Sequence, residues 1–239
     1  KLTNNSASFS YQIMNSVVVA KFGGSVIGVD GISIPIIIQR INSLSRDAKV
    51  VAVFSAPLTI VEGKRRSLTD VALELGKRAE EGKAFDLIIL RKTYEKILEL
   101  VSSEFQEKCR TAIDDCLDMV RIELEKAIEK KEFADEVRSK TLAYSGEILM
   151  SYVMEYILQS QGIKSKVVGL DNWPIITDSN IESTNFLASE SSKKIEFLEK
   201  LLDENQVITI GGFIGRTTDG VVTTYERGGS DRTAADLGI

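Results

Sequence analysis

The hydrophobic pattern is clearest near the start of the chain, where residues 17–22 form a short β-branched run, VVVAKF. Two glycines follow it, as expected for a buried strand that enters a tight loop. Apolar residues then recur at helical spacing across residues 31–47, with Pro35 in the first turn of the predicted helix. A second buried run covers residues 49–54 and stops at a Ser-Ala-Pro turn. Strand, helix and strand in this order predict the beginning of a parallel α/β sheet.

The middle of the chain is predicted to be helical. Residues 67–131 are rich in helix formers, and their many charges are typical of a solvated helix face. Residues 145–162 are apolar on nearly all sides, which predicts a central, buried helix. Glu147 lies in the first turn of that helix, where the dipole favours a carboxylate that still needs a partner when buried. This residue is either an ordinary first-turn acid or a group kept for a ligand.

The last third of the chain returns to the α/β pattern. A short run at residues 166–170 precedes a turn-rich region, residues 191–205 form an amphipathic helix, and residues 206–215 form a strand. A further short strand and a glycine loop follow from residue 221. The chain has no internal repeat, heptad array or low-complexity linker. A single α/β domain over residues 14–239 is therefore the simplest organisation.

Composition narrows the class of protein. The chain has 239 residues, of which 43% are hydrophobic, so it can bury a substantial core. Its formal net charge of −5 predicts no general attraction to nucleic acid or to an anionic membrane. No apolar run is as long as a membrane span requires, and residues 1–13 lack a signal core and are predicted to be a poorly ordered extension. Cys109 and Cys116 are predicted to be reduced thiols, which suits a cytoplasmic location.

Three glycine-bearing loops, at residues 21–25, 211–215 and 227–231, each follow a predicted strand. In a parallel sheet such loops gather at the carboxyl edge, where ligands bind, and their backbone N–H groups can cradle phosphate oxygens. Lys21 beside that cradle could neutralise charge on a phosphoryl group in transfer. The order of lysine and glycines differs from a Walker P-loop, and a dinucleotide-binding G-x-G-x-x-G is absent.

The segment TTYERGGSDRTAAD, residues 223–236, places charged and small residues at a predicted helix entrance. Arg227 could hold a carboxylate through two parallel hydrogen bonds, and Ser230 could cap the helix or donate to the same ligand. The same stretch is equally consistent with a tight turn and a capped helix. If a ligand binds here, the helix start and the arginine favour an acidic one.

The sequence contains no histidine. Ser-His-Asp hydrolysis, Cys-His catalysis and ordinary zinc sites are therefore excluded, and we predict no protein-held metal site. Phosphoryl transfer depends mainly on positioning and on charge stabilisation. A carboxylate acceptor is already ionised near neutral pH, so its kinase needs no general base.

Five blocks of the sequence together resemble the amino-acid kinase domain of aspartokinases, in their order and approximate spacing. They are VVVAKFGGSV, SLTDVALELG, YSGEILMSYV, VITIGGFIG and TTYERGGSDRTAADLG, and the resemblance runs from about residue 16 to the end. It implies a three-layer αβα sandwich with a mainly parallel central sheet. It also implies transfer of the γ-phosphoryl group of ATP, with Mg²⁺ carried by the nucleotide, to the β-carboxylate of L-aspartate. The product, 4-phospho-L-aspartate, begins lysine, threonine and methionine biosynthesis.

The resemblance also implies roles for individual residues. Lys21 is similar to the family's phosphate-stabilising lysine, and Asp231 would orient that lysine or the substrate amine. The implied phosphate and nucleotide contacts, besides Lys21, are Gly23, Gly24, Ser25, Gly212 and Gly215. The implied aspartate contacts are Thr69, Glu147, Arg227 and Ser230, with Glu147 placed against the substrate ammonium.

Several departures from the family pattern modify these expectations. The first loop has Gly-Gly-Ser where the family usually has Gly-Gly-Thr-Ser, and Tyr225-Glu226 replaces the usual Leu-Gly. Glu226 adds negative charge beside an anionic substrate, which predicts weaker affinity. Family members continue beyond the position of Ile239 with a nucleotide-contacting segment and ACT-type regulatory domains. We therefore predict an aspartate pocket in this chain and only weak nucleotide binding.

Three functions stay open at this point. The first is an aspartokinase, predicted to be a cytoplasmic homodimer that binds L-aspartate and ATP but neither nucleic acid nor membrane. The second is another amino-acid kinase with a different acceptor. The third is a non-catalytic binding or assembly module, in which residues 82–131 would serve mainly as an oligomer surface.

Overall fold

The computed structural model describes residues 16–226 and 228–238. Its centre is a four-stranded parallel sheet in the order β1-β2-β6-β5. The four strands are β1 (Val17–Phe22), β2 (Lys49–Phe54), β5 (Ser165–Val167) and β6 (Val207–Gly211). The strand–helix–strand beginning predicted from the hydrophobic pattern is confirmed. The prediction for residues 1–13 lies outside the described residues.

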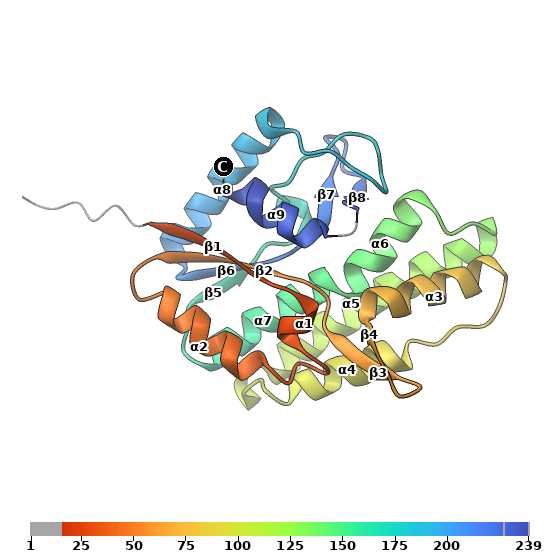
Figure 1. The fold of residues 1–239 in the computed structure, drawn as a ribbon, viewed down its shortest axis with the longest axis horizontal. Helices are drawn as coiled ribbons and strands as arrows, with labels where there is room; N and C mark the ends of the chain where they lie inside the picture. Colours follow the sequence, from red (N-terminus) through yellow and green to blue (C-terminus); the bar gives the residue numbers. More distant parts are fainter. Residues whose placement is uncertain (1–15, 227, 239) are drawn as a thin grey trace, which may run out of the picture.

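Helices cover both faces of this sheet and produce three layers (Figure 1). One face carries α2 (Ile34–Leu44) and α7 (Glu147–Ser160). The other face carries α8 (Ala188–Glu204) and α9 (Gly229–Leu237). Pro35 lies in the first turn of α2, as predicted, because a missing N–H costs nothing there. The α/β architecture with a parallel central sheet is confirmed.

A group of helices stands beside the sheet and packs against α7. It consists of α3 (Leu68–Glu80), α4 (Ile88–Leu98), α5 (Ser103–Lys130) and α6 (Asp135–Ser145). The helical stretch predicted over residues 67–131 is thus three helices, because Gly82 at φ +70° ends the first and a short turn follows Leu98. Cys109 and Cys116 are free and buried on α5, and burial raises the pKa of each thiol to about 12.

Two hairpins and two short helical turns complete the described fold. They are β3 (Leu58–Val61) with β4 (Lys64–Ser67), β7 (Ile214–Arg216) with β8 (Val222–Thr224), α1 (Gly24–Ile27) and the 3₁₀ turn η1 (Leu170–Asn172). The pattern predicted one strand over residues 206–215, but the structure divides it into β6 and β7. Phe213 causes the division, because its φ of +70° turns the chain out of the sheet.

The described helices include none that is both long and apolar enough to cross a membrane. The hydrophobic core lies between the sheet and its two helix layers and continues into the helical group. At the carboxyl edge the core closes with stacked Phe22 and Phe54 rings, whose centroids are 5.3 Å apart. These rings form the apolar base beneath the loops described next.

Candidate active site at the carboxyl edge of the sheet

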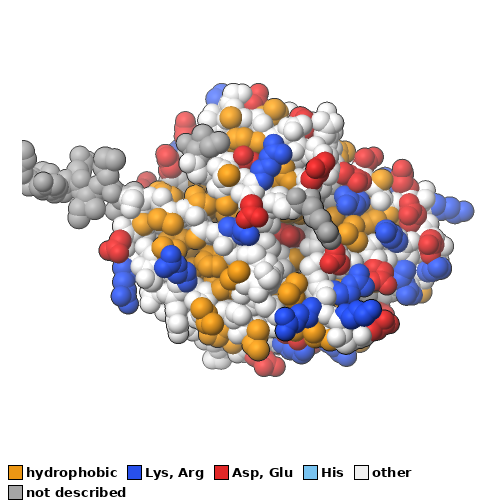
Figure 2. All heavy atoms as spheres, in the orientation of Figure 1, with side chains coloured by type: hydrophobic (Ala, Val, Ile, Leu, Met, Phe, Trp, Pro, Cys, Tyr) orange, Lys and Arg blue, Asp and Glu red, His pale blue; other side chains and the backbone are white. Residues whose placement is uncertain are grey.

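The carboxyl ends of β1, β2 and β6 lie at one level of the sheet. Phe22 pairs in register with Phe54, and Phe54 pairs with Gly211. The loops that follow these strands therefore emerge side by side, as predicted for a parallel sheet. A cleft of about 670 Å³ opens here, between the sheet edge and the helical group. Acidic and basic side chains lie close together on this face of the molecule (Figure 2).

A lysine–aspartate pair crosses the sheet edge. The Nζ atom of Lys21, near the end of β1, lies 2.8 Å from Oδ1 of Asp231 in the first turn of α9. The two side chains come from opposite ends of the chain and meet only through the fold. Asp231 is mostly exposed, with 72% of its side chain accessible, so this is an ion pair at the cleft surface.

The first glycine loop lies directly beside Lys21. A Cβ on Gly24 would come within 2.5 Å of the carbonyl oxygen of Ala56, so only glycine allows this approach of the two loops. The first backbone bonds of the following turn are donated by Val26 and Ile27 to the carbonyl of Gly23, each at 2.9 Å. The amides of Gly24 and Ser25 precede these bonds and are therefore free of the turn's internal pattern.

Helix α9 approaches the loop after β6 closely because Gly212 has no side chain. A Cβ at that position would lie 2.6 Å from the Cβ of Ser230. Ser230 Oγ accepts a hydrogen bond of 3.0 Å from Ser55 Oγ, which joins α9 to the turn after β2. Gly215 lies elsewhere, in β7, where it packs against Thr177 and Thr223 and does not line the cleft.

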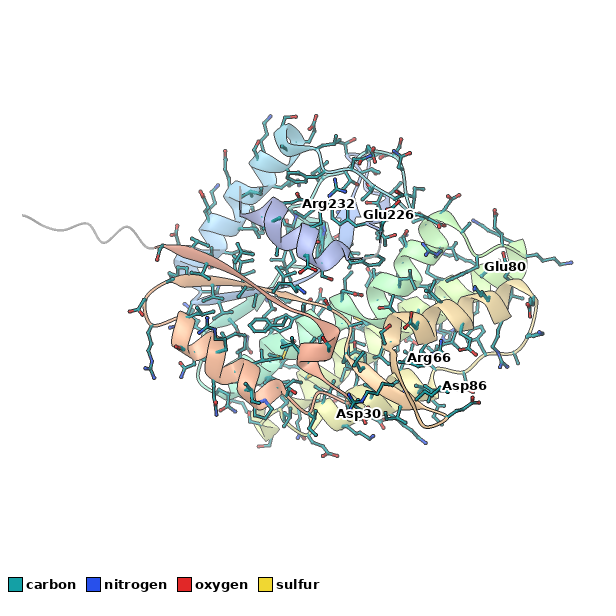
Figure 3. All side chains as sticks on the ribbon, in the orientation of Figure 1. Asp30, Arg66, Glu80, Asp86, Glu226 and Arg232 are labelled. Atoms are coloured by element: carbon teal, nitrogen blue, oxygen red, sulfur yellow. The ribbon has the colours of Figure 1, made fainter. Side chains whose placement is uncertain are left out.

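The turn before α9 is anchored from below by Tyr225. Its hydroxyl donates to Oδ2 of Asp236 at 2.7 Å, and the guanidinium carbon of Arg232 lies 5.0 Å above the centre of its ring. Burial, followed by the bond to Asp236, raises the pKa of Tyr225. Glu226 lies between α9 and α6 (Figure 3), and Arg227 lies outside the described residues.

Glu147 is the most buried of the described charged residues that line the cleft. It begins α7, and the Cβ that Gly146 lacks would lie 2.7 Å from the Cβ of Ala56. Burial raises the pKa of Glu147 to about 8, although hydrogen bonds from its own backbone amide and from that of Ala56 act to lower it. Of the buried side-chain polar atoms in the described part of the chain, Glu147 Oε2 is the one without a hydrogen-bond partner. Buried polar atoms are nearly always paired, so this oxygen indicates a missing partner.

The wall opposite α9 comes from α3 and the corner between α6 and α7. Thr69 is the second residue of α3, whose N-terminus is capped by Ser67 Oγ accepting from the amide of Asp70 at 3.0 Å. Oγ1 of Thr69 would be 3.5 Å from a Cβ on Gly146, so Thr69 lies next to the start of α7. Tyr94 of α4 supports that corner, because its hydroxyl donates to the carbonyl of Gly146 at 2.9 Å.

The structure thus brings together most of the site residues predicted from the sequence. Those that line the cleft are Lys21, Gly23, Gly24, Ser25, Thr69, Glu147, Ser230 and Asp231. Sequence analysis did not assign several other lining residues, among them Ser55, Arg138 and Glu182. Ser55 follows a buried strand at the same edge and could have been found by that rule. Arg138 and Glu182 lack a local signal, because α6 and the loop before α8 reach the cleft only by tertiary packing.

In residues 16–226 and 228–238, no group of three His, Cys, Asp or Glu side chains could hold a metal ion. The described charges of the cleft are instead two cations, Lys21 and Arg138, and a larger number of carboxylates. These carboxylates are Asp70, Glu147, Glu182, Glu226 and Asp231.

The fold and the cleft define an α/β protein with a polar cleft at the carboxyl edge of a parallel sheet. The model of the amino acid kinase family matches residues 16–239, and the chain belongs to this family. A curated relative, the aspartokinase of Rickettsia felis, is 38% identical over 91 residues, which cover 38% of this chain and 22% of that protein. The bifunctional aspartokinase/homoserine dehydrogenase of Buchnera aphidicola is 32% identical over 108 residues, covering 45% of this chain and 13% of that protein.

Solved structures show the same fold. Escherichia coli aspartokinase III in complex with aspartate and ADP (R-state) superposes with a TM-score of 0.74 at 21% identity, over 93% of this chain and 46% of that chain. The same enzyme with lysine and aspartate (T-state) superposes with a TM-score of 0.67 at 22% identity, again over 93% and 46%. The chain therefore spans about half the length of the solved aspartokinases it matches.

Proposed function

We propose that this chain, over residues 14–239, is the amino-acid kinase domain of an aspartokinase. In this reaction the β-carboxylate of L-aspartate attacks the γ-phosphorus of ATP, the bond to the β,γ-bridging oxygen breaks, and 4-phospho-L-aspartate and ADP form. This is the first step towards lysine, threonine and methionine. The supporting observation is one cleft that contains both the Lys21–Asp231 pair beside a glycine loop and a buried carboxylate with an unpaired oxygen. The aspartokinase relatives support the same acceptor.

The phosphoryl group would be bound at the end of β1. Lys21 supplies positive charge next to the glycine loop, where the amides of Gly24 and Ser25 can donate to phosphate oxygens. Asp231 holds Lys21 at 2.8 Å and thereby fixes the direction of the ammonium group. Mg²⁺ would arrive with ATP and neutralise the phosphate oxygens, with Asp231 as the nearest carboxylate of the chain to Lys21. No general base is required, because the attacking carboxylate is already ionised.

The amino acid would be bound on the other side of the same cleft. Glu147 is placed to accept the substrate ammonium with its unpaired oxygen, and this contact would compensate the cost of burying the carboxylate. Thr69 and Ser230 line the cleft on either side and can donate hydroxyl protons to a substrate carboxylate. Arg227 is assigned to a substrate carboxylate by its motif. Binding of the ammonium group by Glu147 and of the α-carboxylate by Arg227 would direct the β-carboxylate towards Lys21.

The decisive experiment traps the product. Acyl phosphates react with hydroxylamine, so incubation with MgATP, L-aspartate and hydroxylamine should yield aspartate β-hydroxamate. Lys21→Met should lower kcat by about 10²–10³-fold with little change in the KM for aspartate, because its charge acts mainly on the transferring group. Lys49→Met is the matched control: Lys49 begins β2 at the opposite edge and donates to the carbonyl of Asn205 at 2.9 Å. Equal losses in both variants would contradict the assignment of Lys21.

Calorimetry separates this proposal from the two other functions. L-Aspartate and MgATP are titrated separately into the chain, followed by L-glutamate and N-acetyl-L-glutamate as alternative acceptors. Preference for a different acceptor would indicate another amino-acid kinase, and amino-acid binding without hydroxamate formation would indicate a binding module. Weak nucleotide binding, the homodimer and the cytoplasmic location stay predictions.

A further inference from the structure

Arg138 is a charged cleft residue to which the proposed function gives no role. It lies on α6, one helical turn before Leu142, which also lines the cleft and precedes Glu147 by five residues. Its Nη1 atom lies 3.1 Å from Oε2 of Glu182, on the loop that precedes α8. Arg138 therefore lies on the amino-acid side of the cleft, opposite the side that carries Lys21.

The charge balance of the cleft makes this position notable. Of the two described cations that line it, Lys21 is already paired with Asp231. The described carboxylates, Glu226 among them, outnumber the two cations. An acidic amino acid entering this cleft needs local positive charge on its own side. Among the described lining residues, Arg138 is the one that can supply it there.

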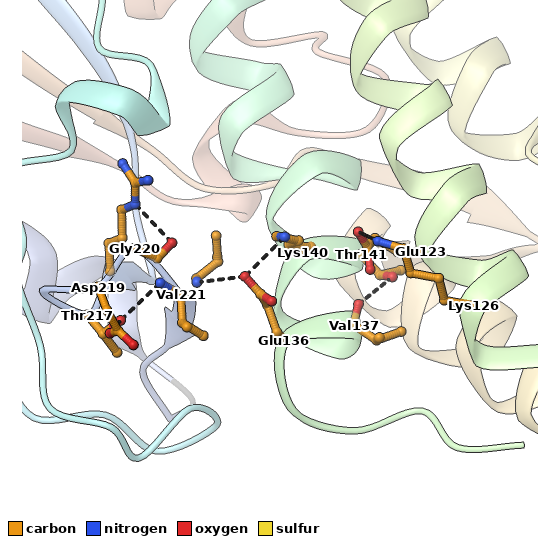
Figure 4. Close-up of polar contacts among 12 residues, drawn as sticks. Glu123, Lys126, Glu136, Val137, Lys140, Thr141, Thr217, Asp219, Gly220 and Val221 are labelled. Atoms are coloured by element: carbon orange, nitrogen blue, oxygen red, sulfur yellow. Dashed lines mark hydrogen bonds and ion pairs between the residues drawn. The ribbon is translucent and has the colours of Figure 1, made fainter. Parts of the chain in front are cut away.

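Helix α6 holds the backbone of Arg138 in place. Oε1 of Glu136 lies 3.0 Å from Nζ of Lys140 and accepts from the amide of Val222 at 3.4 Å, so it ties α6 to β8 (Figure 4). Ser139 Oγ lies 3.5 Å from both Thr224 Oγ1 and the carbonyl oxygen of Ile181. The residues on both sides of Arg138 thus contact the β7–β8 hairpin or the neighbouring loop. Only the long side chain of Arg138 is left to reorient.

Glu182 can release Arg138 without losing its own support. Its Oε1 atom accepts from the amide of Asp135 at 2.9 Å, whereas Oε2 faces Arg138. The neighbouring Ser183 donates to Oε1 of Glu226 at 2.8 Å and keeps that second carboxylate in place. The loop itself is closed by Asp178, whose pKa is lowered by hydrogen bonds from Asn185 and Asn180. Arg138 therefore faces a carboxylate on a pre-formed loop.

The Arg138–Glu182 pair is partly exposed, with 25% and 40% of the two side chains accessible. Ion pairs of this kind contribute little to stability, so exchanging one carboxylate for another costs little. A guanidinium has five N–H donors in a planar fork, and a free carboxylate can take two of them at once. Substrate can therefore compete with Glu182 for the same cation.

We propose that Arg138 is a second carboxylate-binding residue of the acceptor site, which Glu182 holds until an acidic amino acid enters and takes over its guanidinium. This inference rests on the proposed function, because it assumes an acidic amino acid in the cleft. It assigns Glu182 the role of a competitor. The pair then favours acceptors with a second carboxylate over those without one.

The test compares two charge-removing variants whose effects should have opposite signs. Arg138→Gln should weaken L-aspartate binding by roughly tenfold, as expected for loss of a partly exposed charged hydrogen bond. Glu182→Gln should strengthen it by up to about threefold, because the competitor is removed. Calorimetry with L-aspartate measures both. Arg121→Gln and Glu125→Gln are matched controls, because that pair lies on the surface of α5 at 2.9 Å, outside the lining of the cleft.

A purely structural pair would behave differently. If Arg138 and Glu182 only fasten the loop to α6, both variants should weaken binding together, and that result overturns the inference. β-Alanine, which keeps the ammonium group and the carboxylate that would be phosphorylated but lacks the α-carboxylate, should bind both variants as it binds the unsubstituted chain. If the unsubstituted chain binds neither aspartate nor another acidic amino acid, the proposed function fails, and this inference fails with it. Binding of aspartate without opposite signs in the variants refutes the inference alone.

Discussion

Helix α7 carries two buried glutamates, and they have opposite surroundings. Glu155, in the third turn, lies 3.5 Å from Nζ of Lys166 and accepts from Nε2 of Gln159 at 3.1 Å. Glu147, in the first turn, has an Oε2 atom without a partner among the described residues. Burial raises the pKa of both carboxyl groups, but at Glu155 the nearby Lys166 opposes the shift.

The difference between the two ends of α7 separates a structural carboxylate from a candidate functional one. Glu155 is surrounded by its own chain, so a ligand can add little to it. Glu147 faces a cleft with an unpaired oxygen, and an unsatisfied buried polar group costs stability, roughly 1–3 kcal/mol. A cationic ligand group would recover that cost. The comparison therefore predicts different responses to the same Glu→Gln change.

The largest expected effect is on substrate affinity. Glu147→Gln should weaken L-aspartate binding on the order of 100-fold, because the substrate ammonium loses a buried charged acceptor while the side-chain shape is kept. Glu155→Gln should leave the affinity nearly unchanged. Calorimetry with both variants checks the prediction. Similar losses in the two variants would mean that the affinity depends on the packing of α7 rather than on the free oxygen.

The next effect is on the stability of the ligand-free protein. Glu147 has a pKa of about 8 in the folded chain against an ordinary value of 4.5, so folding favours its protonated form. That contribution is complete below about pH 4.5 and is lost as the pH rises towards 8. Glu147→Gln removes this pH-dependent loss of stability and should raise the free energy of unfolding by about 2 kcal/mol at pH 8. The gain is smaller than the shift in pKa alone would give, because the new amide N–H is also buried without a partner.

Urea unfolding at pH 5 and pH 8 measures this difference. Glu155→Gln should have a smaller influence on the pH dependence, because Lys166 counteracts its shift. If the unsubstituted chain and Glu147→Gln lose stability equally between the two pH values, the raised pKa of Glu147 is wrong.

A smaller effect should appear in the pH dependence of binding. The substrate ammonium needs the ionised carboxylate, so binding below pH 8 must release the proton of Glu147. The Kd for L-aspartate should therefore fall by about tenfold between pH 6 and pH 7 and level off near pH 8. Glu147→Gln should bind weakly and without this slope. Calorimetric titration in buffers of different ionisation enthalpy would report the released proton. If no proton is released at pH 6, Glu147 does not bind the substrate ammonium as proposed.

The sequence predicted the regular elements where local pattern decides structure. Strands β1, β2 and β6, the buried helix α7 and Pro35 in α2 all follow from apolar periodicity and from glycine or proline at the ends. Hairpin β3–β4 and helix α6 were not predicted. The hairpin is short and charged, with KRRS as its second strand, and α6 has weak amphipathicity because both of its sides are packed. Neither pattern differs enough from a loop to be recognised locally.

The residues of the candidate site also fall into those that the sequence predicted and those that only the tertiary structure revealed. The glycine loops and Lys21 were identified because a parallel sheet brings the ends of its strands to one edge. Ser230 was identified from its place at a helix entrance, and Asp231 from the family resemblance. Gly212 was predicted to line the phosphate path, but it is not among the residues that line the cleft, and its missing side chain instead gives room to Ser230. Arg138 and Glu182 could not be found, because helix α6 and the loop before α8 acquire their place only when the helical group packs against the β7–β8 hairpin.

By itself the sequence determined the class of fold, the family motifs and the chemistry that a chain without histidine can use, because these depend on residue type and local order. Tertiary structure decided which charges are paired and which are left open. In the sequence, Glu147 and Glu155 are two acids in one apolar segment, and only the tertiary structure shows that Glu155 has a partner in Lys166 whereas Glu147 Oε2 has none among the described residues. Desolvation and pairing depend on every neighbour in space, and no local pattern contains that information.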